Sequence, residues 1–380
     1  MKVLQALYSG FGGHGSVAFS LIGGDRRCSW EHELLFYGIE PLSDVYVQRC
    51  SRYGVDPRCV MKQRGVDVTS WRRAYARFVE SRPDVVLLHS GPLLPPALAY
   101  RRRVPGWNIV VVDHQAHGAK AQSDWVWLTG ALAVADHTVF LTREARVSLP
   151  PLLARAARGR ASVIENGIDL GVFHPGPPLG ERRPLRIGMQ ARFVHWRDHA
   201  TLIRAFASLQ KRRGDLELIL AGEGETRPTA EALAAELGVT DRVRVTGLVA
   251  EPELAELLRG LDVYVHSSLA ETLSTAIMQC MATALPIVAT AIPGVCNMLE
   301  SGSTGELVPV GDVERMAATI EALLESPQRR RALGDRARDV ARHRYSQERM
   351  FEAYDGLLSR EASSGARARR RPSPRRARRG

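Results

Sequence analysis

Short apolar runs that end in polar residues, with helical patterns between them, recur through most of this 380-residue chain. In the first half they cover residues 3–8, 83–90, 108–117, 135–142 and 162–169. In the second half they cover residues 185–190, 216–221, 243–245, 261–266, 285–290 and 307–309. Apolar runs that alternate with helices are typical of parallel strands that are covered on both faces. The pattern therefore predicts an α/β protein with doubly wound parallel sheets.

A break in this rhythm near the middle of the chain predicts two domains. The break is rich in proline, glycine and charged residues, which is typical of a linker. Two domains also suit the length of the chain. The predicted parts are a first domain (1–175), a linker (176–184), a second domain (185–345), a last helix capped by Ser346 (346–360) and a disordered tail (361–380).

The polar stretch 267–282 carries the most candidate chemistry. It follows the apolar run 261–266, and a helical pattern begins near Leu273. Ligands of such strand–loop–helix units bind at the carboxyl end of the strand. The loop offers one acid, Glu271, and the backbone N–H groups of Leu273 and Ser274 at the helix start would favour a phosphate. A lone glutamate in such a loop is also compatible with a purely structural role.

Two loops of the first half offer further candidates. The first strand enters a glycine-rich loop that includes Gly13 but does not have the spacing of a dinucleotide fingerprint. It either lets a backbone approach a ligand closely or forms a tight turn. The run 108–113 ends in a loop with His114 and His117, which serve either a substrate or a structural hydrogen bond.

Composition narrows the class of protein. The chain is 45% hydrophobic and 24% charged, as in soluble globular proteins, and no run is long enough for a membrane span. Five scattered cysteines predict reduced thiols in a cytoplasmic protein and give no pattern for zinc. Of the net charge of +11, eight positive charges come from arginines in residues 366–380, so 11 − 8 leaves +3 for the rest.

Six segments in order resemble glycosyltransferase family 4, whose members use nucleotide-sugar donors and retain the anomeric configuration. These segments are the loop with Gly13, residues 163–175, residues 192–197, residues 221–224, the stretch around Glu271, and residues 292–294 with 304–309. The resemblance covers nearly all of residues 1–360. It implies the GT-B architecture: two Rossmann-like domains that face a central cleft, with a C-terminal helix that crosses back to the first domain.

The resemblance also implies roles for individual residues. Arg192 and Arg197 match the cations that stabilise the diphosphate leaving group, with Arg197 in place of the usual lysine. Glu271 would face hydroxyls of the transferred sugar, and Gln279 stands where a second glutamate holds the donor ribose. His114 would orient the substrate or handle a proton.

The remaining expectations of this resemblance concern the donor site and its requirements. Gly13, Gly222, Leu273 and Ser274 complete the predicted donor-binding set. The family needs no protein nucleophile, and we expect no metal and no cofactor beyond the donor. The acceptor would be a glycan, a lipid-linked sugar or a small molecule.

Other functions stay open at this stage. Gln279 motivates a weak or silent relative that only binds nucleotide sugar or glycan, and a sugar epimerase shares the same architecture. The arginine-rich tail is compatible with an anionic membrane surface at the inner face of the plasma membrane, or with no role. It lacks the interleaved aromatic residues of a specific nucleic-acid site.

Overall fold

Two parallel sheets organise the chain, each within its own unit. The computed structural model describes residues 1–380 except 11–12, 105, 116, 178–183 and 370–380, and leaves out the side chains of 13, 119 and 361–369. Unit 1 comprises Met1–His114, Lys120–Ile164 and the C-terminal segment from Glu348, and unit 2 comprises Gln115–Ala119 and Glu165–Gln347. The predicted α/β class with two doubly wound parallel sheets is confirmed.

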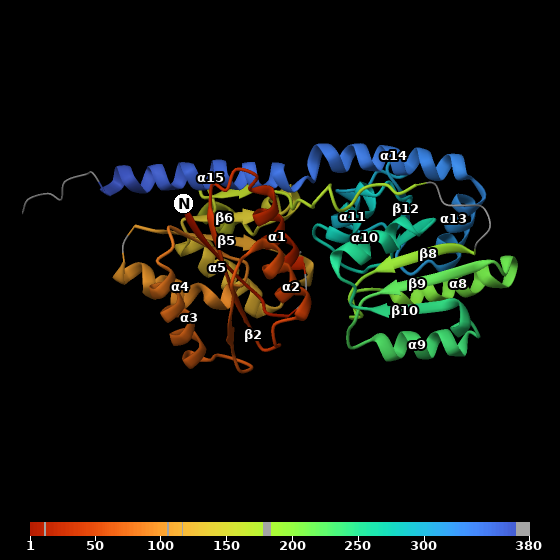
Figure 1. The fold of residues 1–380 in the computed structure, drawn as a ribbon, viewed down its shortest axis with the longest axis horizontal. Helices are drawn as coiled ribbons and strands as arrows, with labels where there is room; N and C mark the ends of the chain where they lie inside the picture. The colour runs from red at the N-terminus through yellow and green to blue at the C-terminus, as the bar shows by residue number, and fades with distance from the viewer. Residues whose placement is uncertain (11–12, 105, 116, 178–183, 370–380) are drawn as a thin grey trace, which may run out of the picture. The chain divides into compact units, whose positions relative to one another are not determined.

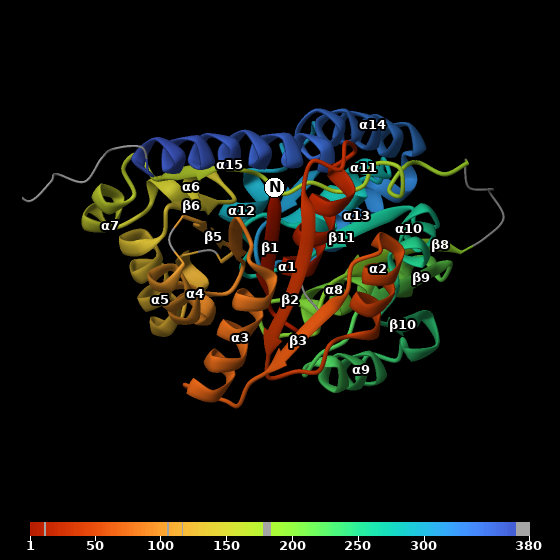
Figure 2. The same cartoon turned by 60° about the vertical axis from the view of Figure 1, so that its left-hand side comes forward.

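The sheet of unit 1 has the order β3-β2-β1-β4-β5-β6-β7, and every strand pair is parallel. Its strands are β1 (Lys2–Leu7), β2 (Glu31–Gly38), β3 (Pro57–Met61), β4 (Val85–Leu88), β5 (Asn108–Asp113), β6 (His137–Phe140) and β7 (Ala161–Val163). The apolar runs predicted β1, β4, β5, β6 and β7. They missed β2 and β3, which lie together at one edge of the sheet (Figure 2).

Helices cover both faces of this sheet. They are α1 (Gly13–Gly24), α2 (Asp44–Tyr53), α3 (Val68–Ser81), α4 (Leu94–Arg103), α5 (Gln122–Val134), α6 (Arg143–Val147), α7 (Pro151–Ala156) and the short 3₁₀ turn η1 (Gly91–Leu93). On one face the strands pack against α3, α4 and α5. On the other face they pack against α1 and α2. The central strands β1, β4, β5 and β6 are therefore buried on both faces, which explains their continuous apolar pattern.

The last helix, α15 (Gln347–Arg369), joins unit 1 (Figure 1). The indole Nε1 of Trp30 donates to Asp355 Oδ1 at 2.7 Å, and the ring of Trp30 lies 4.6 Å from that of Phe351. Arg26 forms an ion pair of 2.8 Å with Glu348. The predicted end of this helix at residue 360 is wrong, because α15 continues to Arg369; the rest of the predicted tail lies outside the described residues.

The sheet of unit 2 has the order β10-β9-β8-β11-β12-β13 and is also parallel throughout. Its strands are β8 (Leu185–Gln190), β9 (Leu216–Ala221), β10 (Val243–Gly247), β11 (Val263–His266), β12 (Ile287–Thr290) and β13 (Glu306–Val308). All six coincide with predicted apolar runs. The strand order reverses direction between β8 and β11, and the carboxyl ends at such a point are where ligands of open α/β sheets bind.

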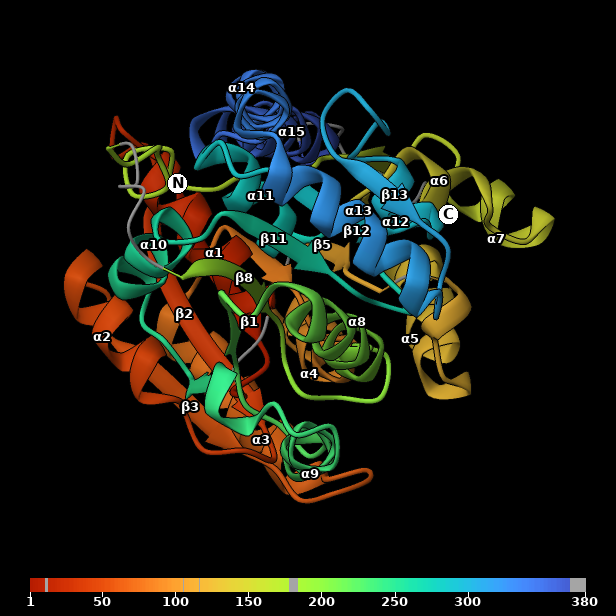
Figure 3. The same ribbon diagram turned by 90° about the vertical axis from the view of Figure 1, so that its right-hand side faces the viewer.

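Helices again cover both faces. They are α8 (His199–Arg213), α9 (Arg227–Glu236), α10 (Glu251–Arg259), α11 (Thr275–Ala282), α12 (Pro293–Cys296), α13 (Val313–Glu325) and α14 (Pro327–Arg344). Two short 3₁₀ turns lie outside these layers: η3 (Thr240–Arg242) before β10, and η2 (His117–Ala119) in the loop after β5. A hydrophobic core lies between the sheet and α8, α9 and α13. Figure 3 shows α8 and α13 beside each other.

The boundary between the units differs from the predicted one. Residues 165–175, expected in the first domain, group with unit 2, and most of the predicted linker lies outside the described residues. Ile168 N–H donates to Tyr345 O at 2.8 Å, and Gln347 N–H donates to Ile168 O at 3.0 Å. The segment that leaves the first domain is thus paired with the segment that returns to it.

Candidate active site

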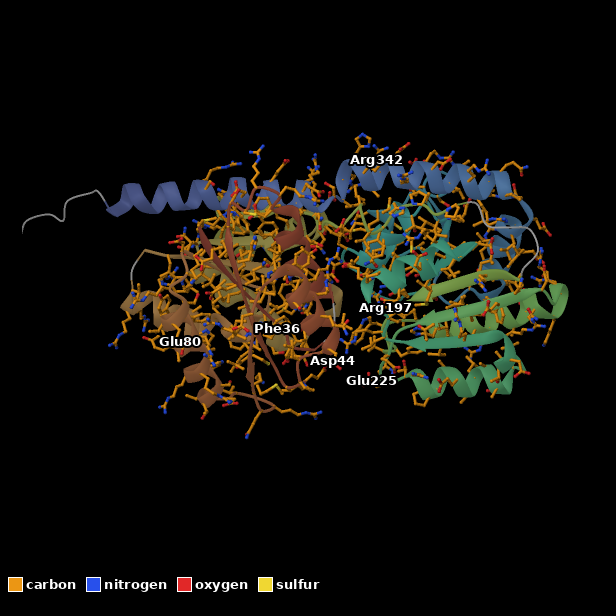
Figure 4. The ribbon with its side chains drawn as sticks, in the orientation of Figure 1. Phe36, Asp44, Glu80, Arg197, Glu225 and Arg342 are labelled. Atoms are coloured by element: carbon orange, nitrogen blue, oxygen red, sulfur yellow. The ribbon has the colours of Figure 1, made fainter. Side chains whose placement is uncertain are left out.

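Two loops of unit 2 meet because the strands before them, β8 and β11, are neighbours. Leu269 N–H donates to Trp196 O at 2.9 Å, Asp198 N–H donates to Ser267 O at 3.1 Å, and Arg197 forms an isolated bridge with Ser268. Figure 4 shows the Arg197 side chain at the edge of the sheet where β8 ends. Residues 74 positions apart therefore share one site.

Arg197 and Glu271 form the centre of this site. Arg197 Nη1 donates to Glu271 Oε2 at 2.7 Å and to Ser268 Oγ at 2.8 Å. His266 Nε2 lies 3.3 Å from both Arg197 Nη1 and Glu271 Oε2. Every hydrogen bond of this guanidinium to a described residue involves Nη1, so Nη2 and Nε remain as donors on its other edge. Arg197 also lines a pocket of about 400 Å³ between the start of α8 and α9.

The electrostatics of the pair favour an ionised glutamate. Burial by itself raises the pKa of Glu271, but the hydrogen bond from His266 and the charge of Arg197 outweigh it and hold the pKa at about 2. Burial lowers the pKa of His266, and Arg197 lowers it further against the opposing effect of Glu271. At neutral pH the site therefore contains an ionised carboxylate, a guanidinium and a neutral imidazole.

The start of α11 is less open than expected. Ser274 is the N-cap, and its Oγ accepts from Ile277 N–H at 3.3 Å. The Ser274 N–H, predicted as a phosphate donor, points at Met298 Sδ at 3.2 Å. The side chains of Leu273 and Ser274 are buried. Two of the backbone N–H groups at this helix start, those of Ser274 and Ile277, therefore already have partners within the protein.

Gln279 lies within α11, a little more than one turn after the start of the helix, and its side chain is buried inside unit 2. It is 5% exposed, and its Oε1 accepts no hydrogen bond from the described residues. No hydrogen bond joins Gln279 and Glu271 in the described part of the chain, so the two do not form a hydrogen-bonded pair. A buried acceptor without a partner is uncommon and normally has a function or a cost.

The loops after β8 and β9 are joined backbone to backbone. Phe193 N–H donates to Glu223 O at 2.9 Å, and Ala191 N–H donates to Ala221 O at 3.0 Å. Gly222 has φ +150°, and a Cβ there would lie 1.9 Å from Ala191 O. Gly222 is thus required for the close approach of the two loops. Arg192 follows in the same loop, with an exposed side chain that has no partner among the described residues.

Three histidines of unit 1 lie together near the carboxyl ends of its central strands. His114 follows β5, His89 follows β4, and His14 lies in the first turn of α1 next to Gly13. His89 Nδ1 lies 2.9 Å from His114 Nε2, and the rings of His14 and His114 are 4.6 Å apart. Next to His114, Lys120 Nζ forms an ion pair of 2.8 Å with Asp113, and both side chains are nearly buried.

Sequence reasoning found some members of these sites and missed others. Arg197 and Glu271 come together, whereas His114 and Gly13 lie in the other unit. The missed residues are His89, Lys120, His266 and Ser268. Each lies at the end of a predicted strand or in the loop after it, so position at a strand end was the available signal.

Among the residues that the structure describes, no three metal-binding side chains converge and no helix is long and apolar enough to cross a membrane.

Two family models match the chain, one for each half. "Glycosyltransferase Family 4" matches residues 11–172, and "Glycosyl transferases group 1" matches residues 179–340. The chain belongs to the family 4-type glycosyltransferases of the GT-B fold. The family resemblance and the GT-B architecture that the sequence predicted are confirmed.

Relatives with curated names are about one third identical to this chain over the part of it that aligns. D-inositol 3-phosphate glycosyltransferase from Thermobispora bispora is 32% identical over 60% of this chain and 57% of its own. Alpha-D-kanosaminyltransferase from Streptomyces kanamyceticus is 33% identical over 38% of this chain and 37% of its own. The chain thus spans about half the length of these relatives.

Solved structures extend the similarity to the whole fold. HepE from Anabaena, in complex with UDP-glucose, has a TM-score of 0.79 at 19% identity and covers 95% of this chain and 100% of its own. TarM from S. aureus, in a complex that contains UDP, has a TM-score of 0.79 at 12% identity over 94% of this chain and 99% of its own. At these identities the likeness concerns the fold.

Proposed function

We propose that this protein is a retaining glycosyltransferase that moves a sugar from a nucleotide-diphosphate sugar to a glycan, a lipid-linked sugar or a small molecule. The observation that carries the proposal is the arrangement of Arg197, which binds Glu271 through Nη1 and keeps Nη2 and Nε available. A guanidinium can bind a carboxylate on one edge and a phosphate on the other. The names of the relatives, which include D-inositol 3-phosphate glycosyltransferase and alpha-D-kanosaminyltransferase, support glycosyl transfer as the class of reaction.

The site would act on the departing diphosphate. Negative charge develops on the leaving group as the glycosidic bond breaks, and fixed cations stabilise it without reorganisation. Arg197 would contribute the edge opposite to Glu271, and the exposed Arg192 would swing onto the same phosphates. Glu271, fully ionised at neutral pH, would accept hydrogen bonds from hydroxyls of the transferred sugar.

A donor screen tests the proposal. Purified protein is mixed with each common UDP-, GDP- and ADP-sugar, and the melting temperature and the release of free nucleotide are recorded. One donor should stabilise the protein and be turned over slowly. Arg197→Ala should abolish both effects, whereas Arg315→Ala, at an exposed position of α13, should change neither. If none of the donors stabilised the protein, the proposal would be refuted.

A second function, donor or glycan binding without efficient transfer, is favoured by Gln279. Its Oε1 is buried and accepts no hydrogen bond from the described residues, where the family pattern has a carboxylate. A neutral acceptor in place of a charged one costs on the order of 1 kcal/mol of binding energy. Gln279→Glu should raise turnover if this position limits the enzyme. A variant as slow as the parent would exclude Gln279 as the limiting residue.

For the location, we propose a cytoplasmic protein that meets an anionic membrane surface through its arginine-rich C-terminus. Eight arginines in residues 366–380 carry most of the net charge. Each basic residue near such a surface contributes about 1 kcal/mol, and salt weakens the attraction. Deletion of 366–380 should abolish sedimentation with vesicles that contain phosphatidylserine. Unchanged sedimentation would refute this part of the proposal.

A further inference from the structure

Gln5 is a polar residue in the middle of a buried strand. It lies in β1, is fully buried, and pairs in register with Leu34 of β2 and Leu87 of β4. A buried amide is costly unless its polar atoms are hydrogen-bonded. Gln5 Nε2 donates to Ala18 O at 3.3 Å, and Gln5 Oε1 lies 3.2 Å from His89 Nε2. The amide is therefore satisfied on both sides, by α1 and by the histidine after β4.

In each of these hydrogen bonds, only one of the two atoms can be the donor. A backbone carbonyl accepts and never donates, so the Gln5 atom that faces Ala18 O must be the NH₂ group. The other atom is then the amide oxygen, which also only accepts. His89 must consequently carry its proton on Nε2 and donate it to Gln5. In a neutral imidazole this leaves Nδ1 of His89 without a proton, as an acceptor.

The protonation of His89 determines which nitrogen of His114 carries a proton. His89 Nδ1 lies 2.9 Å from His114 Nε2, so His114 Nε2 must carry the proton and donate it. Burial, together with a smaller effect of nearby His14, lowers the pKa of His89 to about 3. Burial also lowers the pKa of His114 well below its usual value, with added effects of His14, His89 and Lys120. Both rings are therefore neutral, and His114 has a bare Nδ1.

We propose that Gln5 and His89 form a relay that fixes the tautomer of His114, so that His114 offers Nδ1 as a hydrogen-bond acceptor to a substrate hydroxyl. Gln5 and His89 are positioning residues, since neither needs to touch the substrate. The relay itself is a property of the protein alone, and only the choice of ligand rests on the proposed function. A bare Nδ1 selects a hydroxyl hydrogen, as on a sugar, and rejects a carbonyl or phosphate oxygen.

The relay is tested first without any substrate. Protein labelled with ¹⁵N-histidine is examined by NMR at pH 7, where the two ring nitrogens of each tautomer give different shifts. His114→Gln and His89→Asn identify the two resonance sets. We expect Nε2–H for both histidines in the parent protein. An Nδ1–H tautomer of His114 would overturn the relay.

The decisive variant is Gln5→Met, which keeps the length of the side chain and removes its oxygen. His89 then loses the acceptor that orients it, so His114 should shift to a mixture of tautomers, although the hydrogen bonds of the Gln5 side chain described above reach Ala18 and His89 and not His114. His114 with an unchanged, single Nε2–H tautomer in this variant would also overturn the relay. A change that only loosened the core would lower the melting temperature without moving the tautomer.

A pair of variants at position 89 gives an independent reading, should Gln5→Met not fold. His89→Asn places an amide oxygen where Nδ1 was and should keep His114 in the Nε2–H form. His89→Leu removes the acceptor and should release it. Equal tautomer populations in the two variants would refute the relay.

Kinetics with the identified donor then test the ligand. Loss of one hydrogen bond of about 1 kcal/mol corresponds to about a fivefold fall in kcat/KM, expected for Gln5→Met and His89→Leu and rescued in His89→Asn. Unchanged kcat/KM in both damaged variants would refute the role toward the substrate. If no donor were turned over, the glycosyl transfer and the substrate role would fail together, while the spectra would still decide the relay.

Discussion

Glu271→Gln removes the negative charge from the centre of the site and leaves the shape of the side chain nearly unchanged. The pKa of Glu271 falls from its ordinary value of 4.5 to about 2 in the folded protein. Each tenfold change in proton affinity corresponds to about 1.4 kcal/mol, so the ionised form contributes about 3 kcal/mol to the stability of unit 2. The side chain is only 10% exposed, so screening by solvent is small.

The pH dependence has a definite sign. A carboxyl whose pKa is lowered on folding stabilises the protein above its unfolded pKa, and this stabilisation is lost as the pH falls through the folded value. The difference between the parent and Glu271→Gln should therefore be complete at pH 7, and should shrink as the pH falls from 4.5 toward 2.

Hydrogen exchange followed by mass spectrometry measures this difference locally. Peptides from β11 and α11 should lose protection equivalent to about 2–3 kcal/mol at pH 7, and peptides from β1 and β5 in unit 1 serve as an internal control. The matched variant Glu223→Gln removes a carboxylate that pairs with Arg227 at the surface, where such pairs contribute at most about 1 kcal/mol. Equal, small losses in the two variants would refute the reasoning, as would a loss for Glu271→Gln that stays the same at pH 3.

Three further predictions concern other contacts. Gly222→Ala should destabilise unit 2 by about 2 kcal/mol or more and abolish stabilisation by the donor, because its Cβ would lie 1.9 Å from Ala191 O; thermal unfolding with and without donor measures both effects. Trp30→Phe should lower the protection of α15 in hydrogen exchange by about 1–2 kcal/mol, because the hydrogen bond to Asp355 is lost. Lys120→Met should destabilise unit 1 by about 3 kcal/mol in urea unfolding, because its carboxylate partner stays nearly buried without it.

Each of these predictions has a matched control. Gly302 also has a positive φ, of +76°, but among the described residues no heavy atom beyond its chain neighbours lies within 4 Å of an added Cβ. A loss for Gly302→Ala equal to that of Gly222→Ala would exclude the close approach as the cause. Asp355→Asn keeps an acceptor for the indole and should retain most of the protection of α15. Lys211→Met, at an exposed position of α8, should leave stability within about 0.5 kcal/mol of the parent.

The sequence predicted the strands that are buried on both faces, because such strands are apolar throughout. It missed β2 and β3, since β2 begins with Glu31, His32 and Glu33, and β3 is short with only Val60 buried. It also placed the end of the last helix too early, because a composition that is typical of disorder does not exclude a helical continuation to Arg369. The motifs around Glu271 predicted the family because they depend on local spacing.

What the sequence determined by itself is therefore the class of fold, the strands of unit 2 and the positions of single candidate residues. The tertiary structure alone decided which residues act together. Arg197 meets Glu271 because β8 and β11 are neighbours in the sheet, although they are far apart in the chain. Gln5 reaches His89 because β1 and β4 pair in parallel, and no local pattern contains that register. Contacts across a parallel sheet depend on strand order, and strand order is fixed by the packing of the whole unit.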